Sequence, residues 1–470
     1  MAVETYTIHP TNKYNRPPPP STIALHGLDL LSSPIHIRNH RFFHRPTSTT
    51  SDVIDKLKSS LAEALELYPP VAGTVQANEK GEVYIAMDAE NILGTPFLVE
   101  MKDTPYAGDT EDLSPRTVVL LPPSSSTLAV KVTQFSCGTI AVAASIHHQV
   151  TDLRGFLDFL ELWAQLARGE TIDFTKIPDD WSHNPGRFFS GLIRESTVPT
   201  PPPPPPFMVL PAPATGPPPF LLAPSEISRW KFTKSSMERL KSDFSPSASS
   251  KEHKSDLWIS SGDVLAALLC GVITRARKNA NVARLQGRSS LESQTERIAM
   301  AADGRERSPQ GNMSGGRYFG NFNPLWSATV SRSDLLSLTC ESASRVALAI
   351  RNALNLELSP EAIAYKISFF EAPQNIKPPG RIVWSADVIL TNWCRFDLQG
   401  PKLDFGWGKP FYATAGGGST YPPGYCMMTQ EKDSGDVFVM MTVEQEGADG
   451  LKADSLLNKY ATLVPVHPSC

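Results

Sequence analysis

The sequence predicts a mixed α/β protein made of two α/β halves that a proline-rich crossover joins. Of its 470 residues, 41% are hydrophobic and 20% are charged, which is typical of a globular chain with room for two or three domains. Strand-like and helix-like patterns occur in both halves without a repeat of fixed period. Prolines crowd one segment near the middle of the chain, which favours extended polyproline and disfavours pairing in a sheet. We therefore expect domains over 1–197 and 226–470, with a linker over 198–225.

The clearest pattern of the N-terminal half is a strand-turn-helix sequence. Residues 132–146 are rich in β-branched and small apolar side chains, which predicts buried strand structure with a turn at Cys137-Gly138. From Leu153 to Ala167, apolar residues recur at three- and four-residue steps, which predicts a helix with one apolar face and Asp152 at its N-cap. An earlier leucine-rich helix and two short strands are expected at 53–67, 82–87 and 97–101.

The C-terminal half shows the same mixture of patterns. Its strands are expected at 230–233, 297–302, 382–392 and 436–444. Its helices are expected at 235–243, 264–277, 333–354 and 451–457. Ser261-Gly262-Asp263 is expected to cap the second of these helices. The proline tract before them is interpreted as a stiff spacer, and recognition by a proline-binding partner is the less favoured alternative.

The most informative residues are a histidine and an aspartate, His148 and Asp152, which lie four positions apart in the turn before the predicted helix. The ordinary pKa of imidazole lies near neutral pH, so a histidine held in such a turn can take a proton from an alcohol or an amine. Other interpretations stay open on these residues alone. Asp152 or Thr151 can simply cap the helix, and His147 or His148 can be a hydrogen-bonded core residue. Metal binding by His147, His148 and Asp152 is disfavoured, because adjacent histidines do not share one face, and no metal is expected.

Composition and charge exclude several classes of function. The formal net charge is −4 with a pI near 6.2, and no basic stripe is present, so nucleic acid is not an expected partner. The N-terminus has no signal-peptide pattern, and no run of about eighteen apolar residues predicts a membrane span. Six scattered cysteines favour reduced, buried thiols over a disulfide frame or a zinc site. We expect a cytoplasmic protein and, without heptads, a monomer.

Several separated stretches resemble BAHD-type acyl-CoA-dependent acyltransferases of plants and fungi. The resemblance spans nearly the whole chain, with one signature in each half in the expected order. The stretches are Ala72-Gly73, Phe135-Ser136-Cys137-Gly138, His148-Gln149-Val150-Thr151-Asp152, Trp163-Ala164, Arg168-Gly169, Asp303-Gly304-Arg305, Tyr318-Phe319-Gly320-Asn321 and Asp404-Phe405-Gly406-Trp407-Gly408-Lys409-Pro410.

This resemblance implies two similarly built chloramphenicol-acetyltransferase-like domains of mixed sheets with flanking helices, and a channel between them. It implies no tightly bound cofactor, with acetyl-CoA or another acyl-CoA entering as co-substrate by one mouth and a small-molecule alcohol or amine acceptor by the other. The favoured function is transfer of an acyl group, most readily acetyl, to a hydroxyl of a small secondary metabolite. The alternatives are an N-acyltransferase, a condensation or cyclisation enzyme of the same fold, and a non-catalytic ligand-binding relative.

The resemblance also implies residue roles in and around the turn. His148 would be the general base that takes the proton of the acceptor. Trp393 would donate its indole N–H to the oxyanion of the intermediate, although tryptophans more often serve only as core residues. Asp152 would pair with Arg305 and hold the turn in shape. 

The second signature and the coenzyme contacts are expected away from the chemistry. Asp404 is expected to be ion-paired, and Gly406 and Gly408 to allow a turn that other residues could not make. No phosphate-binding loop is present, because Gly416-Gly417-Gly418 lacks the lysine and helix that follow in such loops. Scattered cations, Lys234, Lys241 and Lys251, are therefore the candidates for binding the phosphates of CoA.

The sequence departs from the family pattern at three positions. Leu153 follows the motif aspartate where glycine is common, Thr74 replaces a frequent arginine, and His147 doubles the histidine. The first of these casts doubt on the local turn geometry. The doubled histidine leaves His147 as an alternative base, although the motif spacing favours His148.

Overall fold

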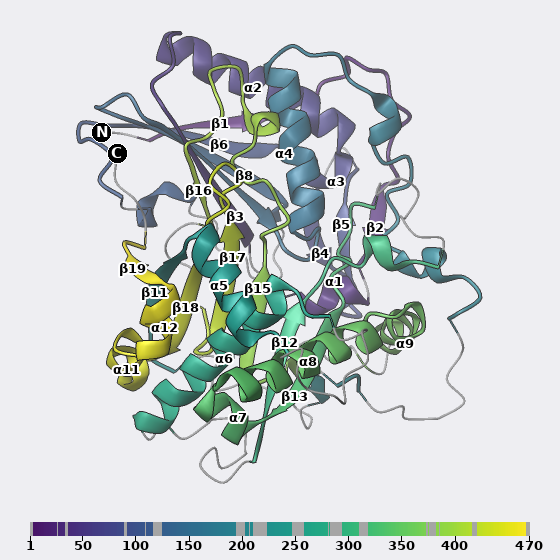
Figure 1. The fold of residues 1–470 in the computed structure, drawn as a ribbon. Coiled ribbons are helices and arrows are strands. Elements are labelled where there is room, and N and C mark those ends of the chain that lie inside the picture. The colour runs from purple at the N-terminus through teal and green to yellow at the C-terminus, as the bar shows by residue number, and fades with distance from the viewer. Residues whose placement is uncertain are drawn as a thin grey trace.

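The structure is a computed structural model of the chain. It describes residues 3–25, 27–32, 36–88, 92–108, 110–115, 125–193, 203–205, 207–209, 223–246, 258–280, 282, 294–309, 318–372, 375, 382–384, 386–415 and 421–466. Two large sheets, each flanked by helices, lie one above the other in the view of Figure 1. The expected mixed α/β fold with two halves is confirmed.

The N-terminal half is built around a six-stranded sheet in the order β1-β6-β8-β9-β3-β16. In that order its strands are Glu4–Ile8, Thr95–Lys102, Leu128–Phe135, Ile140–His147, His36–Phe43 and Tyr412–Thr414. Helices α2 (Thr50–Leu67) and α4 (Leu153–Ala167) contribute their apolar residues to the same buried core as one face of this sheet. A smaller sheet beside it has the order β2-β5-β4-β7, with strands Thr22–Ala24, Val83–Ala86, Thr74–Ala77 and Ser125–Ser126.

The C-terminal half is built around a seven-stranded sheet in the order β13-β12-β15-β17-β18-β11-β19. In that order its strands are Leu325–Ser331, Thr295–Ala301, Val388–Asn392, Tyr425–Gln430, Val437–Glu444, Ser225–Phe232 and Thr462–Val464. Its long central helix, α6 (Ser261–Asn279), is buried along most of its length because small residues let the sheet and neighbouring helices approach closely. A two-stranded sheet pairs β10 (Phe207–Val209) with β14 (Ile382–Trp384).

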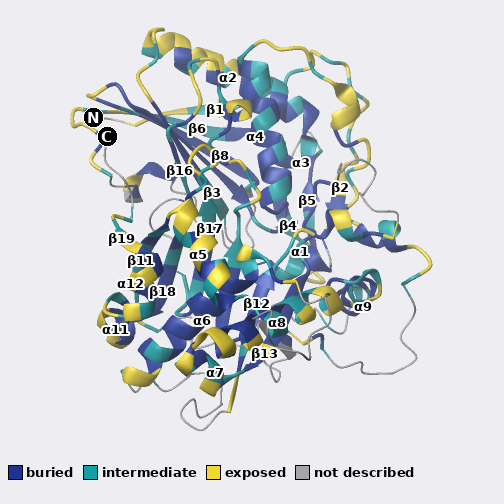
Figure 2. Ribbon diagram, viewed as in Figure 1, coloured by how far each residue is buried: buried dark blue, intermediate teal, exposed yellow. Residues whose placement is uncertain are grey.

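The remaining elements are short or peripheral. The other α-helices are α1 (Leu28–Leu31), α3 (Pro69–Ala72), α5 (Lys234–Phe244), α7 (Arg332–Ser337), α8 (Cys340–Glu357), α9 (Pro360–Glu371), α11 (Ala448–Lys452) and α12 (Ser455–Tyr460). Turns of 3₁₀ helix occur at Glu111–Leu113, Phe174–Lys176, Pro185–Phe189, Arg305–Arg307, Pro401–Leu403 and Gln445–Gly447. Figure 2 shows that the buried residues concentrate in the sheets and on the helix faces that cover them.

The second half of the chain contributes one strand to the N-terminal sheet. After β15 the chain leaves the C-terminal sheet, and residues of the 393–411 segment pack against the N-terminal core. The segment ends in β16, which pairs antiparallel with β3, so that Tyr412 lies opposite Phe42. The chain then returns to the C-terminal sheet as β17. The N-terminal sheet is therefore completed by residues from the second half of the sequence.

The strand-turn-helix prediction around the histidine is confirmed. β8 and β9 pair antiparallel, and their turn contains Gly138 at φ +89, a backbone conformation that favours glycine. Helix α4 spans the expected residues. Its cap is also the expected one, because the carboxylate of Asp152 accepts the N–H of Gly155 at 3.1 Å.

Two long elements that the sequence predicted as continuous are each divided in the structure. Residues 382–392 form two strands, β14 and β15, that belong to different sheets. Residues 333–354 belong to two helices, because Leu338 adopts a left-handed conformation with φ 37 that ends α7. The predicted helix over 451–457 is likewise divided between α11 and α12. 

Two further expectations need correction. The proline tract was expected to stay out of sheets, yet its Phe207–Val209 stretch pairs with β14. These three residues are not prolines, so each has a backbone N–H that can pair in a sheet. The cap of α6 is Ser260, one residue earlier than expected, and it forms a capping box with Asp263.

The cysteines only partly match the expectation of buried thiols. All the described cysteines are free, and Cys270 and Cys426 are buried. Cys137 and Cys340 are exposed, because they lie at a hairpin turn and at the first position of α8. Cys470 lies outside the described residues. No helix among the described residues is long and apolar enough to cross a membrane.

Candidate active site

The turn between β9 and α4 positions His148 at the contact between the two halves. It begins where the N–H of Val150 donates to the carbonyl of His147 at 2.9 Å. The N–H of Gln149 donates to Nδ1 of His147 at 3.2 Å, which fixes the ring of His147 under the turn. His147 is fully buried and His148 is only partly buried. The turn therefore leaves the second histidine partly exposed and keeps the first in the core.

An arginine from the C-terminal half anchors the end of this turn. Arg305 donates from Nη1 and Nη2 to the two carboxylate oxygens of Asp152 at 2.9 and 3.0 Å. The N–H of Phe322 donates to the same carboxylate at 2.8 Å. Arg305 also donates to the carbonyls of Tyr318 and Gly320, at 3.1 and 2.9 Å. The pair implied by the resemblance is present, and all its members lie among buried residues.

The stretch 318–322 binds the turn at two more points. The hydroxyl of Thr151 donates to the carbonyl of Phe319 at 2.5 Å. The side-chain amide of Asn321 donates to the carbonyl of His148 at 2.9 Å. A Cβ placed on Gly155 would lie 2.5 Å from the carbonyl of Phe319, so glycine is required where the segment crosses α4. Leu153 is therefore compatible with the turn. The close approach to the 318–322 stretch falls at Gly155, two residues after Leu153.

The pKa of the His148 imidazole lies below its ordinary value. Burial is the largest cause of the lowering, and the negative charge of Asp152 and the amide of Asn321 offset part of it. Nδ1 of His148 is buried and has no hydrogen-bond partner among the described residues. The ring is therefore neutral near pH 7, which is the form that accepts a proton.

Burial shifts the pKa values of His147 and Asp152 in opposite directions. It lowers the pKa of His147 to about 4, with a further contribution from His148. Burial alone would raise the pKa of Asp152, but the Arg305 guanidinium and the N–H groups of Phe322 and Gly155 hold that pKa below its usual value. Asp152 is thus a charged, fully bonded anchor and has no free lone pair directed at a substrate.

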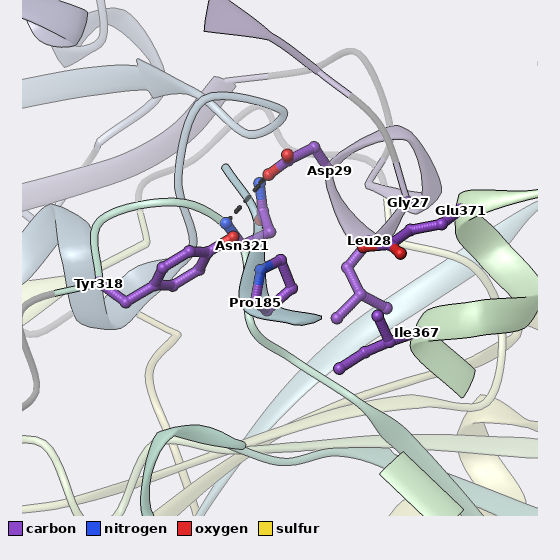
Figure 3. Close-up of a pocket in the computed structure, with 8 residues that line it drawn as sticks. All are labelled: Gly27, Leu28, Asp29, Pro185, Tyr318, Asn321, Ile367 and Glu371. Carbon is purple, nitrogen blue, oxygen red and sulfur yellow. Dashed lines mark hydrogen bonds between the residues drawn. The ribbon is translucent and has the colours of Figure 1, made fainter. Parts of the chain in front are cut away.

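A buried aspartate from the N-terminus completes the support of the turn. One oxygen of Asp29 accepts the backbone and side-chain N–H groups of Asn321 at 3.0 and 2.9 Å, and the other lies 3.1 Å from Nδ1 of His183. Figure 3 shows Asp29 and Asn321 beside a narrow pocket, with Tyr318 and Pro185 around them. Asn321 belongs to a stretch that the resemblance marked. Asp29 carried no such signal, because its partner lies 292 residues away.

Trp393 lies where the chain leaves the C-terminal sheet. Its backbone N–H donates to the carbonyl of Met428 at 2.8 Å, and its partly buried side chain packs against the N-terminal core. This position places the indole at the contact between the halves, on the segment that directly follows β15. Its proposed role as an oxyanion donor stays a prediction.

The second signature, residues 404–410, contains a tight turn. The prediction that Asp404 is ion-paired is wrong, because its carboxylate accepts backbone N–H groups instead. One carboxylate oxygen of Asp404 accepts the N–H groups of Gly406, Trp407 and Gly408 at 2.6, 2.9 and 2.9 Å. Arg168 binds the backbone carbonyl of Asp404 in place of the carboxylate. The two glycines have φ of +106 and +109, so they make a turn that other residues could not make without strain. 

Two of the three candidate CoA lysines, Lys234 and Lys241, lie on one helix, α5. Lys234 is exposed at the start of α5, where its N–H donates to Asp436 at 2.9 Å. The Nζ of Lys241 lies 6.0 Å from the centre of the Trp258 ring. Lys251 and residues 416–418 lie outside the described residues. Among the residues that the structure describes, no group of three or more histidine, cysteine, aspartate or glutamate side chains is arranged to hold a metal ion.

The fold and the site define a two-domain α/β protein with a neutral histidine at the contact between its halves. A family model described as the Transferase family matches residues 2–455. The chain belongs to this family, and the resemblance to BAHD-type acyltransferases is confirmed.

Individual relatives agree with this membership. The chain is 26% identical to a hydroxycinnamoyltransferase of Narcissus pseudonarcissus, over 94% of this chain and 96% of that protein. It is 36% identical to a taxadien-5-alpha-ol O-acetyltransferase of Taxus cuspidata, but over only 27% of this chain and 30% of the relative. The crystal structure of F. sporotrichioides TRI101 with coenzyme A and T-2 has a TM-score of 0.72 at 17% identity, covering 94% of this chain and 100% of that one. At this identity the structural likeness shows the fold.

Proposed function

We propose that the protein transfers an acyl group from acyl-CoA to a hydroxyl of a small molecule, with His148 as general base. The observation that carries this proposal is a histidine that is neutral near pH 7, only partly buried and held at the contact between the two halves. Membership of the Transferase family supports it. The relatives named above as hydroxycinnamoyltransferase and O-acetyltransferase, and a structure of the same fold solved with coenzyme A, support an acyl-CoA donor.

The chemistry needs one proton to move to and from the imidazole. His148 accepts the proton of the acceptor hydroxyl as its oxygen attacks the thioester carbonyl, a step worth about a hundredfold to ten-thousandfold in rate. The tetrahedral intermediate collapses, the carbon–sulfur bond breaks, and the imidazolium returns the proton to the CoA sulfur. The products are the ester and free CoA. Trp393 is the candidate N–H donor to the oxyanion between these steps.

Asp152 and Arg305 serve this chemistry as positioning residues. Both carboxylate oxygens of Asp152 are bonded by Arg305, Phe322 and Gly155. The pair holds the turn that carries His148, and Asn321 holds the carbonyl of the same residue. The two domains are proposed to meet across this contact, with the division near 198–225.

The test is release of free thiol from acetyl-CoA with a panel of hydroxylated natural products. The variant His148→Ala should lose at least about a hundredfold in thiol release. The matched control is His9→Ala, which removes an exposed histidine far from the turn and should leave the rate unchanged. Full thiol release by a folded His148→Ala protein would refute the assignment of the base. Parallel reactions with a hydroxycinnamoyl-CoA and with amine acceptors identify the acyl group and the acceptor atom.

The pH dependence of the same reaction gives a second readout. The active form is the neutral ring, and burial lowers the pKa of His148 below the ordinary value of about 6.5. The acid limb of kcat/KM should therefore lie below pH 6.5, and the rate should stay level from there to neutral pH. An acid limb above pH 7 would contradict a base held in this environment.

A further inference from the structure

The turn that carries His148 is held by a second buried carboxylate besides that of Asp152. Asp29 lies on α1 and is 1% exposed. One of its oxygens accepts two N–H groups of Asn321 at 3.0 and 2.9 Å, and the other lies 3.1 Å from Nδ1 of His183. An ionised carboxylate only accepts hydrogen bonds, so Nδ1 of His183 carries the hydrogen of this contact. Both oxygens of Asp29 are therefore used inside the protein.

The side-chain amide of Asn321 has a partner for each of its hydrogen-bonding groups. Its Nδ2 donates to Asp29 and to the carbonyl of His148, in each case at 2.9 Å. Its Oδ1 accepts the hydroxyl of Ser32 at 3.2 Å. Asn321 is fully buried, so water cannot easily replace a partner that is lost.

These partners fix the orientation of the amide. A half-turn of the amide would exchange the positions of its NH₂ group and its oxygen. The oxygen would then face two other acceptors, the carboxylate of Asp29 and the carbonyl of His148, and both contacts would become repulsive. Asp29 accepts the backbone N–H of Asn321 as well as the side-chain N–H. Its carboxylate therefore determines which end of the amide faces the turn.

The orientation of this amide bears on the direction of the proposed base. The peptide group is planar, so a bond to the carbonyl of His148 holds the peptide plane that follows its Cα. The side-chain conformations open to a residue depend on its backbone dihedrals, so this bond also restricts the imidazole. The neighbouring residue is bound directly, because the side-chain amide of Gln149 donates to the carbonyl of Ser32 at 3.1 Å. Residues 29–32 thus contact the turn both directly and through Asn321.

Packing holds the carboxylate and its partners close together. A Cβ placed on Gly320 would lie 2.9 Å from the ring of His183, so glycine permits the close approach of the 318–322 stretch. Leu28, which precedes Asp29, belongs to the same buried apolar cluster as Tyr318. Both side chains are visible near Asp29 in Figure 3. The position of Asp29 is therefore set by apolar contacts, and its charge is left to act on the hydrogen bonds.

We propose that Asp29 is a positioning residue of the acyl transfer and acts through Asn321. Its carboxylate directs an N–H of Asn321 toward the carbonyl of His148, which keeps the imidazole in place for the acceptor. The proposal rests on the assignment of His148 as the general base. Asp29 itself touches neither substrate, so its loss should impair the chemical step more than binding.

The first test is kinetic and compares Asp29→Asn, Asn321→Ala and the double variant with the wild type. The readout is thiol release from acetyl-CoA with an acceptor that supports turnover. Asp29→Asn should lower kcat about tenfold to a hundredfold, because a displacement of about 1 Å can cost about a hundredfold. KM for both substrates should stay within about threefold. The double variant should be no slower than Asn321→Ala, because Asp29 acts through that residue.

A matched control separates positioning from general stability. Asp454→Asn removes the charge of another bonded aspartate, which pairs with Arg275 at 2.8 Å and caps α12. It should lower the melting temperature and leave kcat unchanged. An unchanged kcat in folded Asp29→Asn would overturn the proposal. Losses of kcat by Asp29→Asn and Asn321→Ala that multiply in the double variant would overturn it as well, because they would show independent action.

The second test does not depend on turnover. In protein that contains isotope-labelled asparagine, the side-chain amide signal of Asn321 is identified by its loss in Asn321→Ala. Its hydrogens should exchange slowly with deuterium in the wild type, because both are bonded inside the protein. They should exchange at least about tenfold faster in Asp29→Asn.

The two tests also separate this proposal from the proposed function. Equal exchange rates in wild type and Asp29→Asn would overturn the role of Asp29, whether or not acyl transfer is found. A wild type that releases no thiol from any acyl-CoA would refute the proposed function. Faster exchange in Asp29→Asn would in that case still support Asp29 as the residue that orients the Asn321 amide.

Discussion

At the scale of single residues, the two histidines next to the base are kept uncharged by the fold. His147 and His36 have ring centroids 5.9 Å apart and pair across β3 and β9. Burial is the main cause that lowers their pKa values, to about 4 for His147 and about 3 for His36. The pKa of His36 is lowered further by His147, and the pKa of His147 is lowered further by His148.

The stability of the protein should depend on pH through these residues. A histidine whose folded pKa is depressed binds protons mainly in the unfolded state, so stability is lost as the pH falls below the unfolded pKa of about 6.5. Each histidine should contribute a loss of about 2 kcal/mol in the free energy of unfolding between pH 8 and pH 5. Urea titrations should show a smaller loss over this range for His147→Gln than for wild type. The exposed variant His9→Gln should match the wild type, and an unchanged slope in His147→Gln would contradict the assignment.

At the scale of elements, the segment 318–322 and the β9–α4 turn behave as one unit. Arg305 reaches Asp152 over 153 residues of sequence, and Asn321 reaches the carbonyl of His148 over 173. These contacts join the halves at the point where the chemistry is proposed. Their loss should therefore affect both stability and the position of the base.

The Asp152–Arg305 pair should show strong coupling. Removal of one partner leaves a buried charge alone, so Arg305→Met and Asp152→Asn should each cost about 3–5 kcal/mol in the free energy of unfolding. The double variant should cost clearly less than the sum of the two. Arg345→Met breaks an exposed pair with Asp334 and should cost at most about 1 kcal/mol. Additive single effects in the urea titrations would show that the pair is not an energetic unit.

The sequence predicted elements whose signals are local. The turn at Gly138, the cap at Asp152 and the apolar face of α4 follow from adjacent residues, and they are correct. Residues 382–392 and 333–354 were each predicted as one element, and each is two. The pattern of apolar residues does not reveal a change of sheet or a left-handed residue such as Leu338. Contacts between distant segments, such as that of Asp29 with Asn321, have no local pattern at all. The resemblance supplied the Arg305 partner, which periodicity alone could not.

At the scale of the whole molecule, Tyr412 connects the two large sheets. It lies on β16, is 6% exposed and stacks on Phe42 of β3 at 5.5 Å. The guanidinium of Arg229, from β11 of the C-terminal sheet, lies 5.5 Å from the centre of its ring. One side chain thus touches both halves, which couples their packing.

Removal of this ring should weaken the whole fold. Tyr412→Ala deletes a buried aromatic side chain, and it should lower the free energy of unfolding by about 3 kcal/mol. Urea unfolding followed by tryptophan fluorescence and by circular dichroism should shift to lower urea for both signals. The control Tyr365→Ala, at a side chain that is 41% exposed, should change stability by less than about 1 kcal/mol. A shift confined to one signal would show that the halves unfold separately.

The pairing of β16 with β3 also bears on what happens when the polypeptide is cut within the crossover. An amino-terminal fragment would expose the edge of β3 along 40–42, which β16 otherwise covers. Such a bare edge recruits other strands, and self-association of the fragment is the expected outcome. A synthetic peptide covering residues 411–415 is the complementary piece that would protect it.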